Sequence, residues 1–145
     1  MLSTQACRTA LLAAVEATNL FKDVQHMTLE RIQDLAFFKS LPSLKVPAAI
    51  LIWKGRDDES QGAAKDRTTH WSLISVFRNV KGNSLEDNLA AVDILTGTTS
   101  RRFLDQQLLD DELTILGTHK VGVAMAPEAI SVLEIAFETR EASER

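Results

Sequence analysis

Cysteine is almost missing from this chain of 145 residues, in which Cys7 is the single example. One cysteine excludes an intrachain disulfide and a metal site built from several cysteines, and such usage fits an intracellular protein best. Long apolar runs are missing too. Glu16 interrupts the apolar region near the N-terminus, and no run approaches the ~20 apolar residues that cross a bilayer. We therefore expect a soluble protein that is not exported.

An excess of basic charge is also lacking. The formal net charge is −4 at pH 7, whereas binding to nucleic-acid phosphates or anionic membranes needs a basic surface. The pair Arg101 and Arg102, close to Asp105, is far short of a nucleic-acid footprint. Hydrophobic residues make up 45% and charged residues 25%, which is the balance of an ordinary globular protein. The sequence predicts one domain with no specific nucleic-acid partner and no membrane partner.

Motifs that carry catalysis or cofactor binding are absent as well. The chain has no Gly-x-Ser-x-Gly sequence, no P-loop and no dinucleotide-binding glycine pattern. His26, His70 and His119 fall in different predicted elements, without a second ligand at the spacing of a helical metal site. The carboxylate runs 57–59 and 110–112 lack the spacing of a calcium loop. We therefore expect no cofactor, no metal and no enzymatic activity.

The stretch from Pro47 to Val80 organises what is present. Pro47–Trp53 is a continuous apolar run of strand length, and His70–Phe77 is a second run rich in β-branched and aromatic residues. The polar segment Lys54–Thr69 joins them, so the pattern predicts a β-hairpin with a long polar tip. A run that is apolar on both faces predicts a central strand covered on each side.

Two helices are predicted before this stretch. Ser3 or Thr4 caps a first helix that runs to about Thr18, and Asn19 is a plausible stop. One apolar face follows the helical period through Cys7, Leu11, Ala14, Val15 and Thr18. A buried, structural role is therefore predicted for the thiol. Leu20–Val24 is predicted as a short connection, and residues 28–39 as a second helical piece.

A helix and a second hairpin are predicted after the central stretch. Ser84 and Asp87 resemble a capping box, and the helix that they open ends near Gly97. Its predicted apolar stripe is Leu85, Leu89, Val92 and Leu95. For residues 98–112, a short helix and an irregular connection both remain open.

The second hairpin is predicted from 113–124 and 130–139. In the latter segment Ser131, Leu133, Ile135 and Phe137 fall on one side, which places an apolar face inward. The fold class predicted is α+β, a single domain over residues 1–140. Its antiparallel sheet has about four strands in two hairpins, and the N-terminal and central helices pack on it. Residues 141–145 are predicted to be a solvated tail.

In their order, these predicted elements resemble the minor tail proteins of Mu-like prophages and the tail terminator proteins of long-tailed phages. The resemblance covers about residues 2–138. It rests on the strand 48–54 after a proline, on the segment 71–79, on the Ser84 helix and on the closing strand that ends at Phe137.

The resemblance implies a structural protein of the virion tail, assembled in the bacterial host cytoplasm. Tail terminators form rings, commonly hexameric, that cap the tail tube and join it to the head connector. The implied partners are other copies of the chain, tail-tube proteins and head-connector proteins. The polar tip is then a candidate interaction loop, with the residues Arg56, Asp57, Asp58, Glu59, Lys65, Asp66 and Arg67.

Two alternatives are open at this point. The chain is an enzymatic or ligand-binding domain if His70, Trp71 and the hairpin tip line a pocket. It is a general interaction module if it offers a sheet edge to an extended partner segment.

Overall fold

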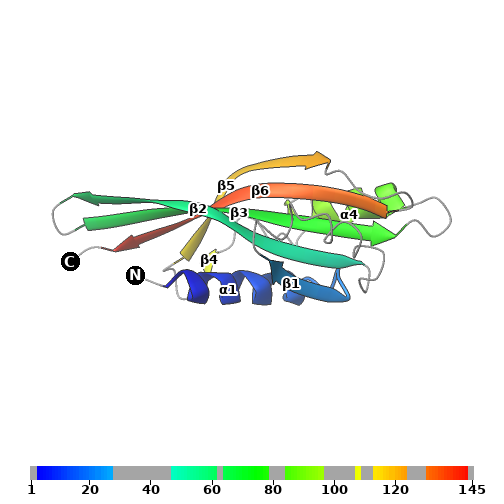
Figure 1. Ribbon diagram of the computed structural model, residues 1–145, viewed down its shortest axis with the longest axis horizontal. Helices are drawn as coiled ribbons and strands as arrows, with labels where there is room; N and C mark the ends of the chain where they lie inside the picture. Colours follow the sequence, from blue (N-terminus) through cyan, green and yellow to red (C-terminus); the bar gives the residue numbers. More distant parts are fainter. Residues whose placement is uncertain are drawn as a thin grey trace.

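A computed structural model describes residues 3–27, 47–61, 64–78, 84–96, 107–108, 113–123 and 130–143. They form an α+β domain, as predicted, whose sheet has the strand order β1-β2-β3-β6-β5-β4 (Figure 1). The elements are α1 (Thr4–Ala17), β1 (Asp23–Met27), β2 (Ala48–Gln61), β3 (Ala64–Arg78), α4 (Ser84–Leu95), β4 (Gln107–Leu108), β5 (Leu113–Val123) and β6 (Ile130–Ser143).

The two predicted hairpins are present, and they meet in the middle of the sheet. Strand β2 pairs with β3, β3 with β6 and β6 with β5, all antiparallel. The sheet has six strands rather than about four, because β1 and β4 add one at each edge. Strand β1 pairs with β2 in parallel, so the sheet is mixed. Residues 20–24 were predicted to be a connection, but Asp23 and Val24 begin β1. This segment is a strand because it pairs with the apolar residues 48–52 of β2.

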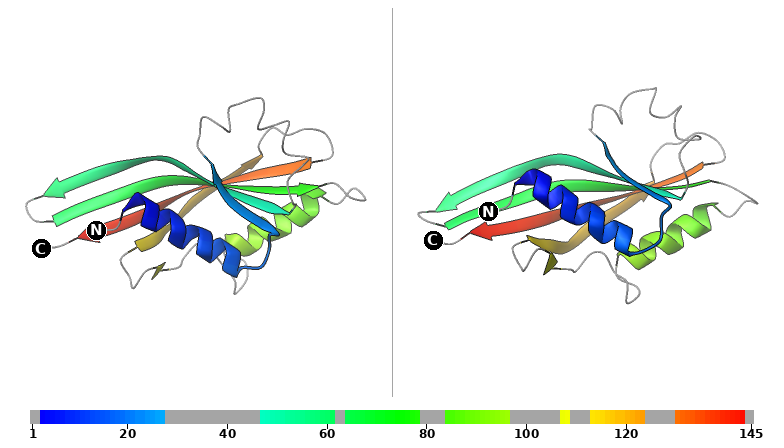
Figure 2. Two further views of the ribbon diagram at one scale, coloured as in Figure 1. Left: turned by 60° about the horizontal axis from the view of Figure 1, so that its bottom comes forward. Right: turned by 90° about the horizontal axis from the view of Figure 1, so that it is seen from below.

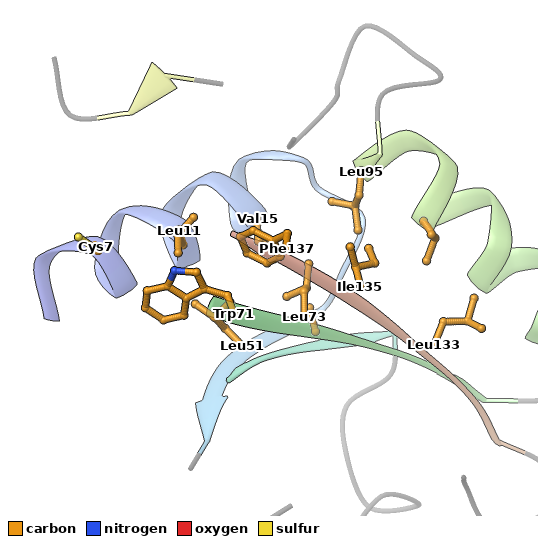
Figure 3. Packing of buried hydrophobic residues seen from close by; sticks show 12 residues of the cluster. Cys7, Leu11, Val15, Leu51, Trp71, Leu73, Leu95, Leu133, Ile135 and Phe137 are labelled. Atoms are coloured by element: carbon orange, nitrogen blue, oxygen red, sulfur yellow. The ribbon is translucent and has the colours of Figure 1, made fainter. Parts of the chain in front are cut away.

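Both helices pack on the same face of the sheet (Figure 2). The shared core is formed by Cys7, Leu11, Val15, Ala49, Leu51, Trp71, Leu73, Val92, Leu95, Leu133, Ile135 and Phe137 (Figure 3). The opposite face of β2 is buried as well, since Ile50 and Ile52 are each about 1% exposed. The prediction of a strand covered on both faces is therefore confirmed.

Helix α1 follows the sequence prediction closely. The hydroxyl of Ser3 caps it by accepting a hydrogen bond from the backbone N–H of Ala6 at 3.1 Å. Cys7, Leu11 and Val15 are its buried positions. The chain leaves the helix through Asn19, whose φ of 57° lies in the left-handed region that asparagine tolerates better than most residues.

Helix α4 is present, but it is rotated relative to the predicted stripe. Leu85 and Leu89 are 50% and 43% exposed, whereas Asn88 is fully buried beside Ala91 and Val92. The cause is a set of hydrogen bonds that the hydrophobic pattern does not encode. The Asn88 amide accepts from the Ser75 hydroxyl at 2.5 Å, and it donates to the Ser75 and Ser131 carbonyls at 2.9 and 3.0 Å. Satisfying these buried groups outweighs the burial of two leucines.

Strand β6 confirms the predicted alternation and extends beyond it. Leu133, Ile135 and Phe137 face the core, and the strand continues to Ser143. The predicted solvated tail is therefore wrong for its first residues, because Glu141 is only 2% exposed. The predicted helix at 28–39 lies outside the described residues, as does most of 98–112, in which Gln107–Leu108 form β4.

Candidate functional site

The predicted contact loop is part of a three-stranded arm. We define the arm as residues 54–61 of β2, 64–70 of β3 and 138–143 of β6. Strands β2 and β3 remain paired from Gly55 opposite His70 out to Gln61 opposite Ala64. Strand β6 pairs with β3 as far as Ser143 opposite Lys65. Figures 1 and 2 show these strand ends extending past the N-terminal end of α1. The candidate residues thus lie on paired strands, so the predicted long polar tip is an extension of the β2–β3 hairpin and not a loop.

A β-bulge separates the arm from the core. Trp53 pairs with Trp71 and Gly55 with His70, so Lys54 is an extra residue in β2. Gly55 has a φ of 129°, a conformation that side-chain-bearing residues rarely adopt. The bulge shifts the alternation of β2 by one residue, which places Arg56 on the helix face of the sheet.

The helix face of the arm is held to α1 by polar contacts. The Arg56 guanidinium donates to the Thr4 hydroxyl at 3.1 Å, and its Nε lies 3.4 Å from the Asp58 carboxylate. Arg67 donates to the other Asp58 oxygen at 2.9 Å. Asp58 therefore holds two guanidinium groups, one on each strand of the hairpin.

A buried thiol–carboxylate contact lies behind these residues. Cys7 Sγ donates to Glu141 Oε1 at 3.1 Å, and both residues are almost completely buried. Burial, together with the hydrogen bond to Glu141, raises the pKa of the Cys7 thiol to about 12. The thiol is thus neutral at physiological pH and is a packing and hydrogen-bonding group rather than a nucleophile. The contact joins the first helix to the last strand.

The opposite face of the arm carries a histidine between two carboxylates. His70 Nε2 lies 2.9 Å from Asp57 Oδ2, and Nδ1 lies 3.1 Å from Glu138 Oε1. The hydrogen bond to Asp57 raises the pKa of His70, with support from the charge of Glu138 and against a smaller opposing effect of burial. Both ring nitrogens donate in the protonated form, so His70 cross-links β2, β3 and β6.

Two more ion pairs lie on this face of the sheet. Arg140 Nη2 is 2.9 Å from Asp66 Oδ2, which joins β6 to β3. Lys54 Nζ, at the bulge, is 3.8 Å from Glu134 Oε1. Each of these pairs is solvent-exposed and contributes ~0–1 kcal/mol to stability. Together with the contacts of His70 they fix the direction in which the strands leave the core.

The candidate residues therefore separate into two groups. Arg56, Asp57, Asp58, Asp66 and Arg67 form ion pairs or hydrogen bonds within the chain. The Glu59 side chain is exposed, and Lys65 is placed by its backbone on β3. The sequence prediction missed Glu138, Arg140 and Glu141, because their roles depend on which residues of β3 they face. The alternation of β6, continued past Thr139, would have indicated Arg140 and Glu141, whereas Glu138 already lay within the predicted strand.

The alternative pocket at His70 and Trp71 does not form as predicted, because adjacent strand residues point to opposite faces. Trp71 is 1% exposed within the core, and its indole N–H donates to the Thr139 hydroxyl at 2.8 Å. His70 lies on the other face with Asp57 and Glu138. The two side chains therefore cannot line one site.

In the described part of the chain, no group of three or more histidine, cysteine or acidic residues is placed to hold a metal ion. The carboxylates of Asp57 and Glu138 contact opposite nitrogens of His70, so the three side chains do not converge on one point. Neither of the described helices has the length and hydropathy to span a bilayer.

The arm also has an open edge. Among the described residues, β1 covers the outer side of β2 only along residues 48–52. The outer side of residues 53–61 has no strand partner within that part of the chain. An open strand edge presents backbone donors and acceptors that another strand can use. Trp53, which is 43% exposed, lies where this edge begins.

Comparison with known proteins gives weak structural likenesses. No protein-family model matches the chain, and no curated protein matches its sequence. It is similar to a chain in the virion of a native gene transfer agent particle, with a TM-score of 0.44 and 14% identity over 98% of this chain and 100% of that chain. It is also similar to the type 4 fimbrial biogenesis protein PilO from Pseudomonas aeruginosa, with a TM-score of 0.34 and 12% identity over 99% of this chain and 73% of that chain.

Proposed function

We propose that this chain is a structural subunit of a phage or prophage tail, a tail terminator or minor tail protein that assembles into a ring at the end of the tail tube. The observation that carries the proposal is the order of the elements. The resemblance requires an N-terminal helix, a strand led by Pro47, a hairpin, a helix from Ser84 and a closing strand. Elements α1, β2, β3, α4 and β6 follow in this order.

The arm supports the proposal as a contact element. A charged hairpin without tertiary support would be mobile, and its ordering on assembly would cost conformational entropy. Here the ion pairs of Asp58 and Asp66, together with the contacts of His70, hold it before any partner binds. The arm in this proposal contacts the neighbouring subunit or the tail-tube and head-connector proteins. Its role is structural and requires no cofactor.

The test is the state of assembly of the purified chain. Native mass spectrometry and negative-stain microscopy over a wide concentration range should show a discrete closed oligomer, of which a hexamer is the expected form. The same measurements with added tail tubes should show the oligomer at one end of the tube. A monomer at all concentrations that also leaves tube ends bare would refute the proposal.

A general interaction module is the second candidate function. The open edge along residues 53–61 favours it, because strand addition to such an edge is a common mode of peptide recognition. This candidate has no closed symmetry. It predicts a one-to-one complex with an extended peptide and no ring in the same native mass spectra.

A further inference from the structure

The sheet has a second open edge, on the side opposite β2. Strand β4 covers β5 only at Leu113 and Thr114. Among the described residues, 115–123 of β5 therefore have no strand partner on their outer side. Within the described part of the chain there are thus two open edges, residues 53–61 of β2 and residues 115–123 of β5, on opposite sides of the sheet. Open edges of this kind pair readily with other strands.

The charges of the two edges are complementary. Residues 53–61 of β2 carry three acidic residues, Asp57, Asp58 and Glu59, against the two basic residues Lys54 and Arg56. Strand β5 contains Lys120 and no acidic residue. We propose that the β2 edge of one copy pairs with the β5 edge of the next, so that each interface continues the sheet from copy to copy. This proposal rests on the proposed ring and names the contact that closes it.

The strand directions favour this pairing. Strands β2, β3, β6 and β5 alternate in direction along the sheet. Strand β5 therefore runs opposite to β2. Copies related by a rotation that preserves strand direction would bring β5 against β2 of the next copy in antiparallel orientation. Antiparallel pairing is slightly the more stable kind per residue.

The registers that satisfy the charges are few. Position 120 pairs with Ala136, on the face of the sheet that also carries Asp57 and Glu59. Two antiparallel registers therefore keep the helices of successive copies on one face, with Lys120 opposite Asp57 or opposite Glu59. In those registers Arg56 lies opposite Val121 or Val123, and so it meets no like charge. Opposite charges across a strand pair stabilise it and like charges destabilise it.

These registers require the two edges to slide relative to each other. Within one copy Asp57 pairs with Thr68, and Thr68 pairs with Arg140 of β6. Asp57 therefore lies at the height of Arg140 along the strands, whereas Lys120 pairs with Ala136 of β6. Successive copies are therefore staggered by at least the four residues between Arg140 and Ala136. That stagger is roughly 13 Å at about 3.3 Å per residue. A constant stagger tilts the strands relative to the ring axis, as it does in closed barrels.

Pairing of two β2 edges about a two-fold axis is disfavoured by the same charges. In such a pair the residue at the axis lies directly opposite the same residue of the second copy. An axis at Arg56, Asp57, Asp58 or Glu59 therefore places two like charges opposite each other. An axis at Gly55 places Lys54 opposite Arg56. These like-charge contacts arise for a two-fold axis at any of residues 55–59, whereas the head-to-tail contact that rings need places no like charges opposite each other.

The test uses variants with one added cysteine and keeps the native Cys7, which is buried and has a raised pKa and is therefore unreactive. Glu59→Cys and Lys120→Cys are each labelled with a short bismaleimide, alone and as an equimolar mixture. Ala13→Cys, at an exposed position of α1, is the matched control. Circular dichroism melts confirm that all variants fold. We expect the mixture to give a cross-linked dimer at least about tenfold above any sample containing the control.

The outcomes separate the interface from the function. If Glu59→Cys alone cross-links as strongly as the mixture, the edges pair about a two-fold axis and the proposal is overturned. No product at the highest attainable protein concentration also overturns it, whether or not the wild type forms a ring. A ring without cross-links places the contact elsewhere. Cross-linked dimers from a wild type that forms no ring in native mass spectra refute the tail-terminator function alone. The charge exchange Glu59→Lys with Lys120→Glu should assemble better than either single substitution.

Discussion

The orientation of α4 gives the sharpest test of the structure. The hydrophobic pattern predicts that Leu89 is in the core and Asn88 is outside, whereas the structure has them reversed. We expect Asn88→Ala to lower the free energy of unfolding by about 2–4 kcal/mol. The substitution removes a side chain with four hydrogen bonds to Ser75 and Ser131 and leaves their buried groups unpaired, at about 1–3 kcal/mol per unsatisfied group.

The matched control is Leu89→Ala on the same helix. Because Leu89 is 43% exposed, its truncation should cost less than about 1 kcal/mol. Leu95→Ala, at a fully buried position, should cost about 2–5 kcal/mol. Urea unfolding followed by circular dichroism measures all three. A large effect of Leu89→Ala together with a negligible effect of Asn88→Ala would refute the orientation.

Asn88→Asp extends this test, because it keeps the shape of the side chain and removes both N–H donors. A carboxylate would face the carbonyls of Ser75 and Ser131 at a fully buried position. We expect Asn88→Asp to be more destabilising than Asn88→Ala at pH 7, and to recover part of that loss at pH 4 to 5, where the buried acid is protonated.

Three further outcomes follow from the core and the arm. Cys7 should resist maleimide labelling at pH 8 in the folded protein and react fully in urea, and fast labelling without unfolding would contradict its burial. By NMR, His70 should titrate above pH 6.5. Its pKa should fall further in Asp57→Asn than in Glu138→Gln, because the hydrogen bond to Asp57 is the larger cause of the shift. Since its pKa is raised on folding, the stability that His70 contributes is complete below pH 6.5 and is lost as pH rises through the folded pKa. A His70→Gln variant should therefore show less loss of stability over that range. Trp71→Phe, which removes the indole N–H, should cost about 1–3 kcal/mol in urea unfolding.

The arm shows where sequence reasoning fails and why. Its residues 54–61 and 64–69 are polar, and polar residues between apolar runs predict a loop. Side-chain contacts accompany the strand pairing of the arm: Arg67 with Asp58 across the hairpin, and His70 with Glu138 and Arg140 with Asp66 between β3 and β6. No local pattern encodes these partners. They become neighbours only after the register of β2, β3 and β6 is set, and the bulge at Lys54 changes that register midway.

The sequence by itself determined the elements whose burial pattern is local. The cap at Ser3, the apolar face of α1, the strand after Pro47 and the alternation of β6 are each set by residues a few positions apart, and so their periodicity was sufficient. Tertiary structure decided the rotation of α4, the strand β1 and the polar arm. In these three cases the deciding interaction is a buried hydrogen bond, a neighbouring strand or an ion pair between segments far apart in the chain. The free energy of such contacts exists only once the sheet has formed.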